Sequence, residues 1–211
     1  MVSNARPPER CAVAVFAKAP VPGAVKTRLV PVLTPAQAAA LHEKLVERAL
    51  ATARDAAIGP VELWCAPDAE HPFFARCARR FGATLHVQEG TDLGERMARA
   101  FASAHRARRA LVLIGSDCPA LGPHDLRDAA AALAPGHAVF APAEDGGYVL
   151  VALAEPAPAL FSGMRWGDPD VMLRTRERAA RAGLVLKELR TLWDVDRPED
   201  WQRLAAEGVL E

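Results

Sequence analysis

Three cations follow the first apolar segment of the chain and could together bind an anion. Residues 12–16 form a short apolar run, which predicts a buried strand. The loop after it breaks at two prolines and Gly23, and it carries Lys18, Lys26, Thr27 and Arg28. Cations and backbone N–H groups that follow a strand can hold phosphates. Spacing alone leaves a second interpretation open, a surface loop with solvated cations. The prolines exclude a Walker A loop and a GxGxxG motif.

Carboxylates stand after two later apolar segments. Asp117 follows residues 110–114, the most apolar predicted strand, and such a carboxylate suits Mg²⁺ or Mn²⁺ that bridges to phosphates. The alternative is an aspartate that caps the next turn. Asp145 precedes Gly146 and Gly147 and could bind the metal, bind a sugar hydroxyl or act as a base. Asp-Gly is equally the strongest short signal for a β-hairpin.

Three weaker signals lie elsewhere in the chain. Asp194 and Asp196 point to the same side of an extended segment and suit a second metal contact. The alternative is a helix start, with Asp196 before Pro198 and Glu199 and Asp200 in the first turn, which would not explain Asp194. Residues 88–97 contain a glycine-rich entry to a helix, which could seat a base or ribose but also fits an ordinary helix start. Trp166 lies in a loop, where it could pack or contact an acceptor.

The elements that must position these residues alternate between strands and helices. Strands are predicted at 12–16, 61–65, 84–87, 110–114, 138–142, 148–153 and 184–189, with helices at 36–54, 72–81, 92–106, 123–133, 168–182 and 198–206. This alternation predicts an α/β fold, a Rossmann-like three-layer sandwich with a mostly parallel, mixed sheet. One strand between residues 138 and 153 is expected to run antiparallel. Ligands of such sheets lie beyond the carboxyl ends of the strands.

Composition narrows the classes of function. The chain has 211 residues, 51% of them hydrophobic, and 26 basic against 26 acidic side chains, which argues against a nucleic-acid binder. No apolar run is long enough for a membrane span, and the N-terminus lacks a signal-peptide core. We therefore expect a cytoplasmic protein with a frayed lead at residues 1–10 and a single domain at 11–211. Neither the four cysteines nor the six histidines have zinc-ligand spacing.

Taken together, six motifs resemble those of a known superfamily. They are FAKAPVPGAVKTRL, DLGERM, GSDCPAL, EDGGYVLVAL, MRWG and DVDRPED. In this order they resemble the nucleotide-diphospho-sugar transferases, which have the glycosyltransferase A-type fold. More narrowly, they resemble the bacterial "transferase 1" group associated with radical-SAM and selenodomain proteins. The loop and tail are also similar to those of guanylyltransferases of the molybdenum-cofactor and 2-phospho-lactate type.

The resemblance implies roles for individual residues. The nucleotide phosphates would be bound by Lys18, Gly23, Lys26 and Arg28, and the base and ribose would face Gly90, Leu93 and Gly94. The metal would be bound by Asp117 with Asp194 or Asp196, and Asp145, Gly146 and Gly147 would form the acceptor side. One departure matters, because residues 116–119 offer a single carboxylate where glycosyltransferases usually have a DxD motif. That departure keeps nucleotidyl transfer open.

The leading hypothesis is a transferase that depends on Mg²⁺ or Mn²⁺ and uses an activated nucleotide. Its catalytic residues would be Lys26, Arg28, Asp117 and Asp145. A nucleotide-sugar donor, a small-molecule acceptor and glycosyl transfer are favoured. The alternative is a guanylyltransferase-like enzyme that uses a nucleoside triphosphate and releases pyrophosphate. A third hypothesis is a nucleotide-binding module without catalysis. Oligomeric state is left open by the sequence.

Overall fold

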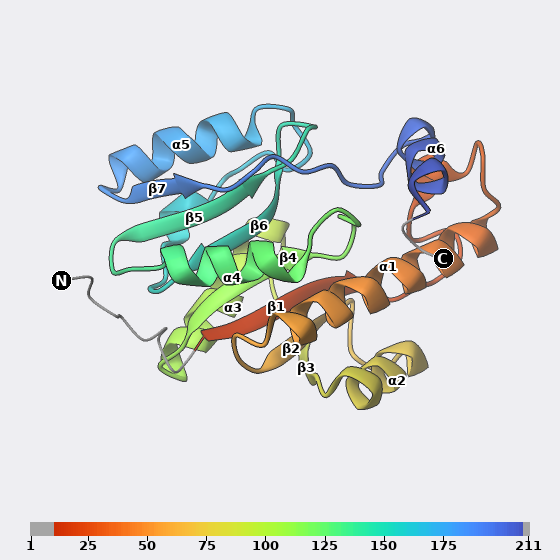
Figure 1. The fold of residues 1–211 in the computed structure, drawn as a ribbon, viewed down its shortest axis with the longest axis horizontal. Helices are drawn as coiled ribbons and strands as arrows, with labels where there is room; N and C mark the ends of the chain where they lie inside the picture. The colour runs from red at the N-terminus through yellow and green to blue at the C-terminus, as the bar shows by residue number, and fades with distance from the viewer. Residues whose placement is uncertain (1–10, 209–211) are drawn as a thin grey trace.

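The strands form one mixed sheet. The computed structural model describes residues 11–208, and in them seven strands pair in the order β3-β2-β1-β4-β6-β5-β7 (Figure 1). The strands are β1 (Cys11–Lys18), β2 (Val61–Ala66), β3 (Thr84–Val87), β4 (Ala110–Gly115), β5 (His137–Pro142), β6 (Tyr148–Leu153) and β7 (Val185–Glu188). Strand β6 is antiparallel to both of its neighbours, and the other pairs are parallel. The predicted mixed sheet with an antiparallel strand between 138 and 153 is confirmed.

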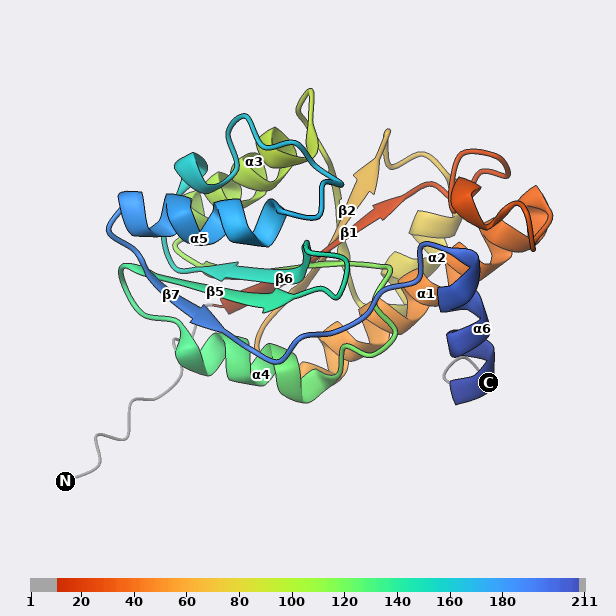
Figure 2. The same ribbon diagram turned by 90° about the horizontal axis from the view of Figure 1, so that it is seen from above.

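Helices cover both faces of the sheet, which gives the predicted three layers. The helices are α1 (Pro35–Ala56), α2 (Pro72–Phe81), α3 (Leu93–Arg106), α4 (Pro123–Ala132), α5 (Val171–Arg181) and α6 (Pro198–Glu207), with short 3-10 turns η1 (Thr27–Leu29) and η2 (Pro158–Leu160). Seen from above, α3 and α5 lie on one face and α1, α2 and α4 on the other (Figure 2). Helix α6 lies at the end of the molecule where it contacts η1.

Alternation along the strands supplies a core to each layer. In β1, Val13 and Val15 join the cluster formed with α1, α2 and α4, whereas Ala14 and Phe16 join the cluster formed with α3 and α5. Successive side chains of a strand point to opposite faces, so a strand that is apolar at every position must be covered on both sides. The central strands are therefore fixed in position, and their carboxyl ends provide rigid attachment points for loops.

The ends of α1 and α5 show how local chemistry sets helix boundaries. Helix α1 begins at Pro35, one residue before its predicted start, with Thr34 in a capping box with Gln37. The start predicted for α5 at residue 168 is wrong, because that helix begins at Val171. The Gly146 carbonyl accepts the backbone N–H of Met172 at 2.8 Å, so the segment before α5 is held against the β5–β6 turn.

Two sequence-based expectations fall at the limits of the described residues. The frayed lead predicted at residues 1–10 lies outside them, and a single domain over 11–211 stays a prediction. Within 11–208, no helix has both the length and the apolar character that crossing a bilayer requires.

Candidate functional site

A two-part cleft opens where the chain departs from β1 and β4 in opposite directions. These strands are neighbours, with Phe16 paired to Gly115, and β2 and β6 lie on their outer sides. Such a switch in strand order leaves a crevice at the carboxyl ends. Two cavities of about 330 and 240 Å³ occupy this place and share Phe16, Leu93 and Gly115 in their walls. We call them the cationic half, which contains Lys18, Lys26, Thr27 and Arg28, and the acidic half, which contains Asp145, Asp168 and Asp194.

Lys26 is buried beneath the cationic half and holds two distant segments together. Its side chain is only 4% exposed, and its ammonium lies 2.7 Å from Oδ1 of Asp117. It also donates a hydrogen bond of 2.6 Å to the backbone carbonyl of Val195. Lys26 has a left-handed backbone conformation with φ of 50°, which turns the loop into η1. The residue predicted as a phosphate ligand therefore also fixes the predicted metal ligand.

The other two cations of the loop are accessible. The Arg28 guanidinium pairs with the Asp196 carboxylate, and both side chains are exposed. No ion-pair partner of Lys18 is found within residues 11–208. Because exposed pairs are worth little in water, an incoming phosphate could replace Asp196 on Arg28 at small cost. The cationic half thus offers two groups to an anion, while Lys26 stands behind them.

Asp117 keeps its negative charge in this setting. Partial burial alone would raise the pKa of its carboxyl group, but the charge of Lys26, supported by His42, holds that pKa below the ordinary value. The hydroxyl of Ser116 donates a further hydrogen bond of 3.3 Å to Oδ1. Oδ1 is thus engaged by Lys26 and Ser116, which leaves Oδ2 as the oxygen available to a ligand.

Asp194 has the opposite electrostatic environment. Burial, followed by the charges of Asp145 and Asp117, raises the pKa of Asp194 to about 7. Asp145 itself is exposed on the β5–β6 turn, where its Oδ1 accepts the N–H of Gly147 at 2.9 Å. The turn is a hairpin connection between β5 and β6, and it also lines the cleft, so a role of Asp145 in the chemistry stays a prediction. Three carboxylates on different segments therefore influence one region, and of these Asp117 is paired with Lys26.

The donor set fits a hard divalent cation that is completed by substrate oxygens. Within residues 11–208, no three His, Cys, Asp or Glu side chains converge as a ready-made metal site. Mg²⁺ is usually held by one or two carboxylates together with phosphates and water, so such a cage is not required. Asp117 and Asp194 provide two carboxylates of this kind. Asp196, the third predicted ligand, is instead directed to Arg28.

The capping alternative for the tail segment holds for the acids after Pro198, Glu199 and Asp200, and not for Asp194 or Asp196. Oδ2 of Asp200 accepts the backbone N–H groups of Asp196 at 3.0 Å and Arg197 at 2.7 Å, which caps α6. Asp194 takes no part in that cap and lines the acidic half. Asp194 and Asp196, expected on the same side, face different halves of the cleft.

Four predicted glycines lie outside the cavity walls and shape the loops around them. They are Gly23, Gly90, Gly94 and Gly146. A Cβ added to Gly94 would lie 2.5 Å from the Phe161 carbonyl oxygen and 3.0 Å from the Trp166 ring. Gly94 therefore permits close packing of the Trp166 loop on α3. Of the predicted base-facing residues, Leu93 lines the cleft, and on the acceptor side Gly147 and Trp166 line it with Asp145.

Comparison with known proteins places the chain in a family. The family described as "Uncharacterized protein conserved in bacteria (DUF2064)" matches residues 49–168. This chain belongs to the DUF2064 family. Among curated proteins, none matches its sequence.

Solved structures share the fold of this DUF2064 protein. One, from Desulfovibrio desulfuricans G20, is provisionally named a nucleotide-diphospho-sugar transferase and is 32% identical, with a TM-score of 0.78 over 89% of this chain and 82% of that chain. A nucleotidyl transferase from Methanothermobacter is 14% identical, with a TM-score of 0.66 over 94% and 97%. Rv0371C of Mycobacterium tuberculosis H37Rv, in complex with manganese, is 18% identical, with a TM-score of 0.55 over 92% and 97%. The last two support the fold alone.

Two residues of the cleft in this DUF2064 protein were not assigned from the sequence. His42 on α1 is 4% exposed, and its Nε2 lies 3.0 Å from the Lys18 carbonyl oxygen while its Nδ1 lies 3.9 Å from Oδ1 of Asp117. Burial lowers the pKa of this imidazole. Gln88 ties β1 to β2 by donating to the carbonyls of Ala17 and Trp64. Because a helical histidine and a strand-end glutamine are common, sequence spacing gave no signal for either.

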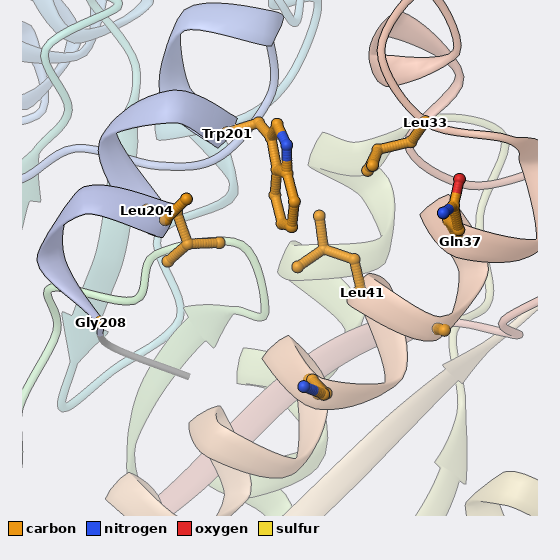
Figure 3. A pocket seen from close by; sticks show the side chains of 9 residues that line it. Leu33, Gln37, Leu41, Trp201, Leu204 and Gly208 are labelled. Carbon is orange, nitrogen blue, oxygen red and sulfur yellow. The ribbon is translucent and has the colours of Figure 1, made fainter. Parts of the chain in front are cut away.

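A separate apolar pocket lies between α1 and α6. It has a volume of about 400 Å³, and Leu41 from α1 faces Trp201 and Leu204 from α6 across it (Figure 3). None of the predicted site residues lines this pocket, and its charged lining residue is Lys44. Size alone does not mark the site, because the chemistry-bearing side chains gather at the strand ends.

Proposed function

We propose that this protein transfers a glycosyl group from a nucleotide sugar to a hydroxyl group of a small-molecule acceptor. The observation that carries the proposal is the meeting of a cationic and an acidic half of one cleft beside Asp117, at the carboxyl ends of β1 and β4. The provisional name of the Desulfovibrio relative supports a nucleotide-sugar substrate. We also propose that, within DUF2064, the chain belongs to the radical-SAM-associated transferase 1 group, on its six motifs.

In the proposed complex, the diphosphate lies in the cationic half. Lys18 and Arg28 bind its oxygens, with Arg28 released from Asp196, and the loop of Gly23 and Thr27 surrounds it. The ammonium of Lys26 uses two of its three hydrogens on protein oxygens, so one remains for the phosphate. These positive groups are fixed before the reaction and stabilise the charge that develops on the leaving diphosphate. Leu93, at the junction of the two halves, contacts the nucleoside.

A Mg²⁺ or Mn²⁺ ion would be held by Asp117 and Asp194. When bound, it would act as a Lewis acid that neutralises the diphosphate. Asp117 suits this role because its carboxyl group stays ionised beside Lys26. A cation would also relieve the repulsion between Asp194 and its neighbouring carboxylates.

The acceptor reacts in the acidic half, where Asp145 acts as the base. Its carboxylate takes the proton of the acceptor hydroxyl as that oxygen forms a bond to the anomeric carbon. The bond from this carbon to the phosphate oxygen breaks at the same time, and the nucleoside diphosphate leaves with its electron pair. The products are a glycoside and a nucleoside diphosphate.

Nucleotidyl transfer is a second candidate because the loop after β4 carries a single carboxylate, Asp117, rather than a pair. In that reaction the cationic half would hold a nucleoside triphosphate. The acceptor oxygen would bond to the α-phosphorus, and pyrophosphate would leave. The two candidates therefore differ in the released product.

A nucleotide panel tests the proposal directly. Thermal stability would be measured with nucleotide sugars and nucleoside triphosphates, each with and without Mg²⁺ or Mn²⁺. A ligand at about 100 times its Kd stabilises by roughly 2.7 kcal/mol, which moves the Tm of a chain of this size by about 5–11 °C. We expect such a metal-dependent shift with a nucleotide sugar. A shift with triphosphates only would favour nucleotidyl transfer, and no shift with any nucleotide would refute both.

Turnover separates an enzyme from a binding module. The nucleotide that gives the largest shift would be incubated with a mixture of small alcohols, and free nucleoside diphosphate and pyrophosphate would be quantified. We expect Asp117→Asn to abolish release of the nucleoside diphosphate while the protein stays folded. A protein that binds nucleotide but releases neither product with any acceptor would be a module without catalysis.

A further inference from the structure

The acidic half of the cleft is built to exclude anions. Its lining includes the carboxylates of Asp145, Asp168 and Asp194, and no Lys, Arg or His of the described residues lines it. A phosphate or carboxylate placed there would face like charges, which costs several kcal/mol at a protein interface. The cations of the neighbouring half lie on the other side of the shared wall, where the donor diphosphate is proposed to bind.

The rest of this cavity is apolar and small. Its wall is formed on the α3 side of the sheet by Phe16 of β1, Leu113 of β4 and Met97 of α3. Val171 of α5 completes this wall. A volume of about 240 Å³ is below the usual size for a drug-like ligand, so it limits the acceptor to a small group. Apolar walls favour a ring or short chain over a fully hydrated polyol.

Two aromatic side chains contribute their rings to the wall, while their polar atoms are buried behind it. The hydroxyl of Tyr148 and the indole N–H of Trp166 are buried and have no hydrogen-bond partner within residues 11–208. Both side chains line the acidic half, and their rings lie edge to face at 6.2 Å. Because neither polar atom is accessible to a molecule the size of water, a ligand in the cavity meets these two side chains through the carbon atoms of their rings.

The wall that carries these groups is held rigidly. Gly94 allows the Trp166 loop to pack on α3, and Gly146 allows the carbonyl of Pro169 to approach so closely that a Cβ would lie 1.9 Å away. The rings of Tyr148 and Phe140 also lie edge to face, with their centroids 4.9 Å apart. A rigid wall distinguishes ligands better than a mobile one, since little ordering is needed on binding.

We propose that the acidic half accepts an uncharged alcohol with an apolar ring or chain and rejects phosphorylated or carboxylated acceptors, with the carboxylates of its lining as the groups that reject anions and the rings of Tyr148 and Trp166 as part of its apolar wall. This inference rests on the proposed function and names the acceptor class of that same site. The acceptor hydroxyl faces Asp145, and the apolar body lies against the rings.

A matched set of probes tests the charge selection. Binding of benzyl alcohol, benzoate and benzyl phosphate to the full chain would be titrated by saturation-transfer NMR. We expect benzyl alcohol to bind at least about tenfold more tightly than either anion, a difference of 1.4 kcal/mol. Asp168→Lys places a cation in this wall and should therefore reduce the ratio between the affinity for benzyl alcohol and the affinity for either anion. Equal or tighter binding of benzyl phosphate to the wild-type protein would overturn the inference.

The nucleotide panel keeps the two levels of the proposal distinguishable. A nucleotide-sugar shift combined with preferred binding of benzyl phosphate would leave the proposed function standing and overturn the acceptor class. The absence of a shift with any nucleotide would overturn both, whatever the probes do.

Discussion

Replacement of Lys26 by methionine should destabilise the protein by about 2–3 kcal/mol. Its ammonium makes two charged contacts, at 2.6 Å to the Val195 carbonyl and at 2.7 Å to Asp117. A hydrogen bond to a charged group contributes about 1.5–3 kcal/mol, and breaking a buried ion pair costs about 3–5 kcal/mol. The Asp117 side chain is 47% exposed, so water can solvate its carboxylate after Lys26 is removed. The expected loss of stability is therefore about 2–3 kcal/mol, below the range for a fully buried ion pair.

Equilibrium urea unfolding of Lys26→Met, Asp117→Asn and the double variant measures this contribution. We expect the double variant to be little less stable than Lys26→Met, with a coupling of about 1 kcal/mol between the two sites. In a thermal scan, Lys26→Met should lower the Tm by about 4–12 °C. Lys18→Met is the matched control, because Lys18 is exposed and should change stability by less than about 0.5 kcal/mol.

The result that would refute this reasoning is a Lys26→Met variant within about 0.5 kcal/mol of wild type. Lys26 would then be a free phosphate ligand rather than a fixed support of Asp117. The same conclusion would follow if the stability losses of Lys26→Met and Asp117→Asn simply added in the double variant, because the two side chains would then not be coupled. Nucleotide affinity, measured on the same variants, should fall for both lysines because both face the cationic half.

Two further predictions concern packing and pH. Gly94→Ala should cost about 1–3 kcal/mol, because its Cβ would meet the Phe161 carbonyl, whereas Gly115→Ala, with open space around it, should leave the Tm close to wild type. Burial would raise the pKa of Asp125, but its paired hydrogen bonds with Arg190 lower that pKa below 3.8. The stability that this pair contributes should be complete above pH 3.8 and should be lost as the pH falls through the lowered pKa of Asp125. Asp125→Asn should therefore lower the free energy of unfolding by about 2 kcal/mol at pH 7 and flatten the acid limb of a pH–stability curve.

The elements of the fold could be predicted because their signals are local. Helix α2 occupies the predicted range 72–81, which a proline opens and a glycine closes, and β3 and β6 also match their predicted ranges. The start of α5 could not be predicted in the same way. It depends on a contact between Gly146 and Met172, and no pattern within either segment encodes that pairing.

The candidate site was predictable in its location but not in its internal pairing. The rule that loops at the carboxyl ends of parallel strands meet was enough to bring Lys18, Arg28 and Asp117 to one cleft. The contact between Lys26 and Asp117 depends on the path of the tail segment, whose Val195 N–H binds the Asp117 carbonyl at 2.9 Å. A motif match can also point to the wrong role for a residue. Gly94 matches a nucleotide motif, and yet it packs against Phe161.

The polarity of the cleft discriminates between the two proposed reactions. In glycosyl transfer, negative charge grows on the leaving diphosphate while the anomeric carbon becomes positive, as in other reactions with an oxocarbenium-like transition state. A cationic half on one side and carboxylates such as Asp145 and Asp168 on the other complement both changes. In nucleotidyl transfer to a phosphate, the attacking and leaving groups are both negative. The acidic half would then oppose the acceptor, so this charge arrangement favours glycosyl transfer to an uncharged hydroxyl group.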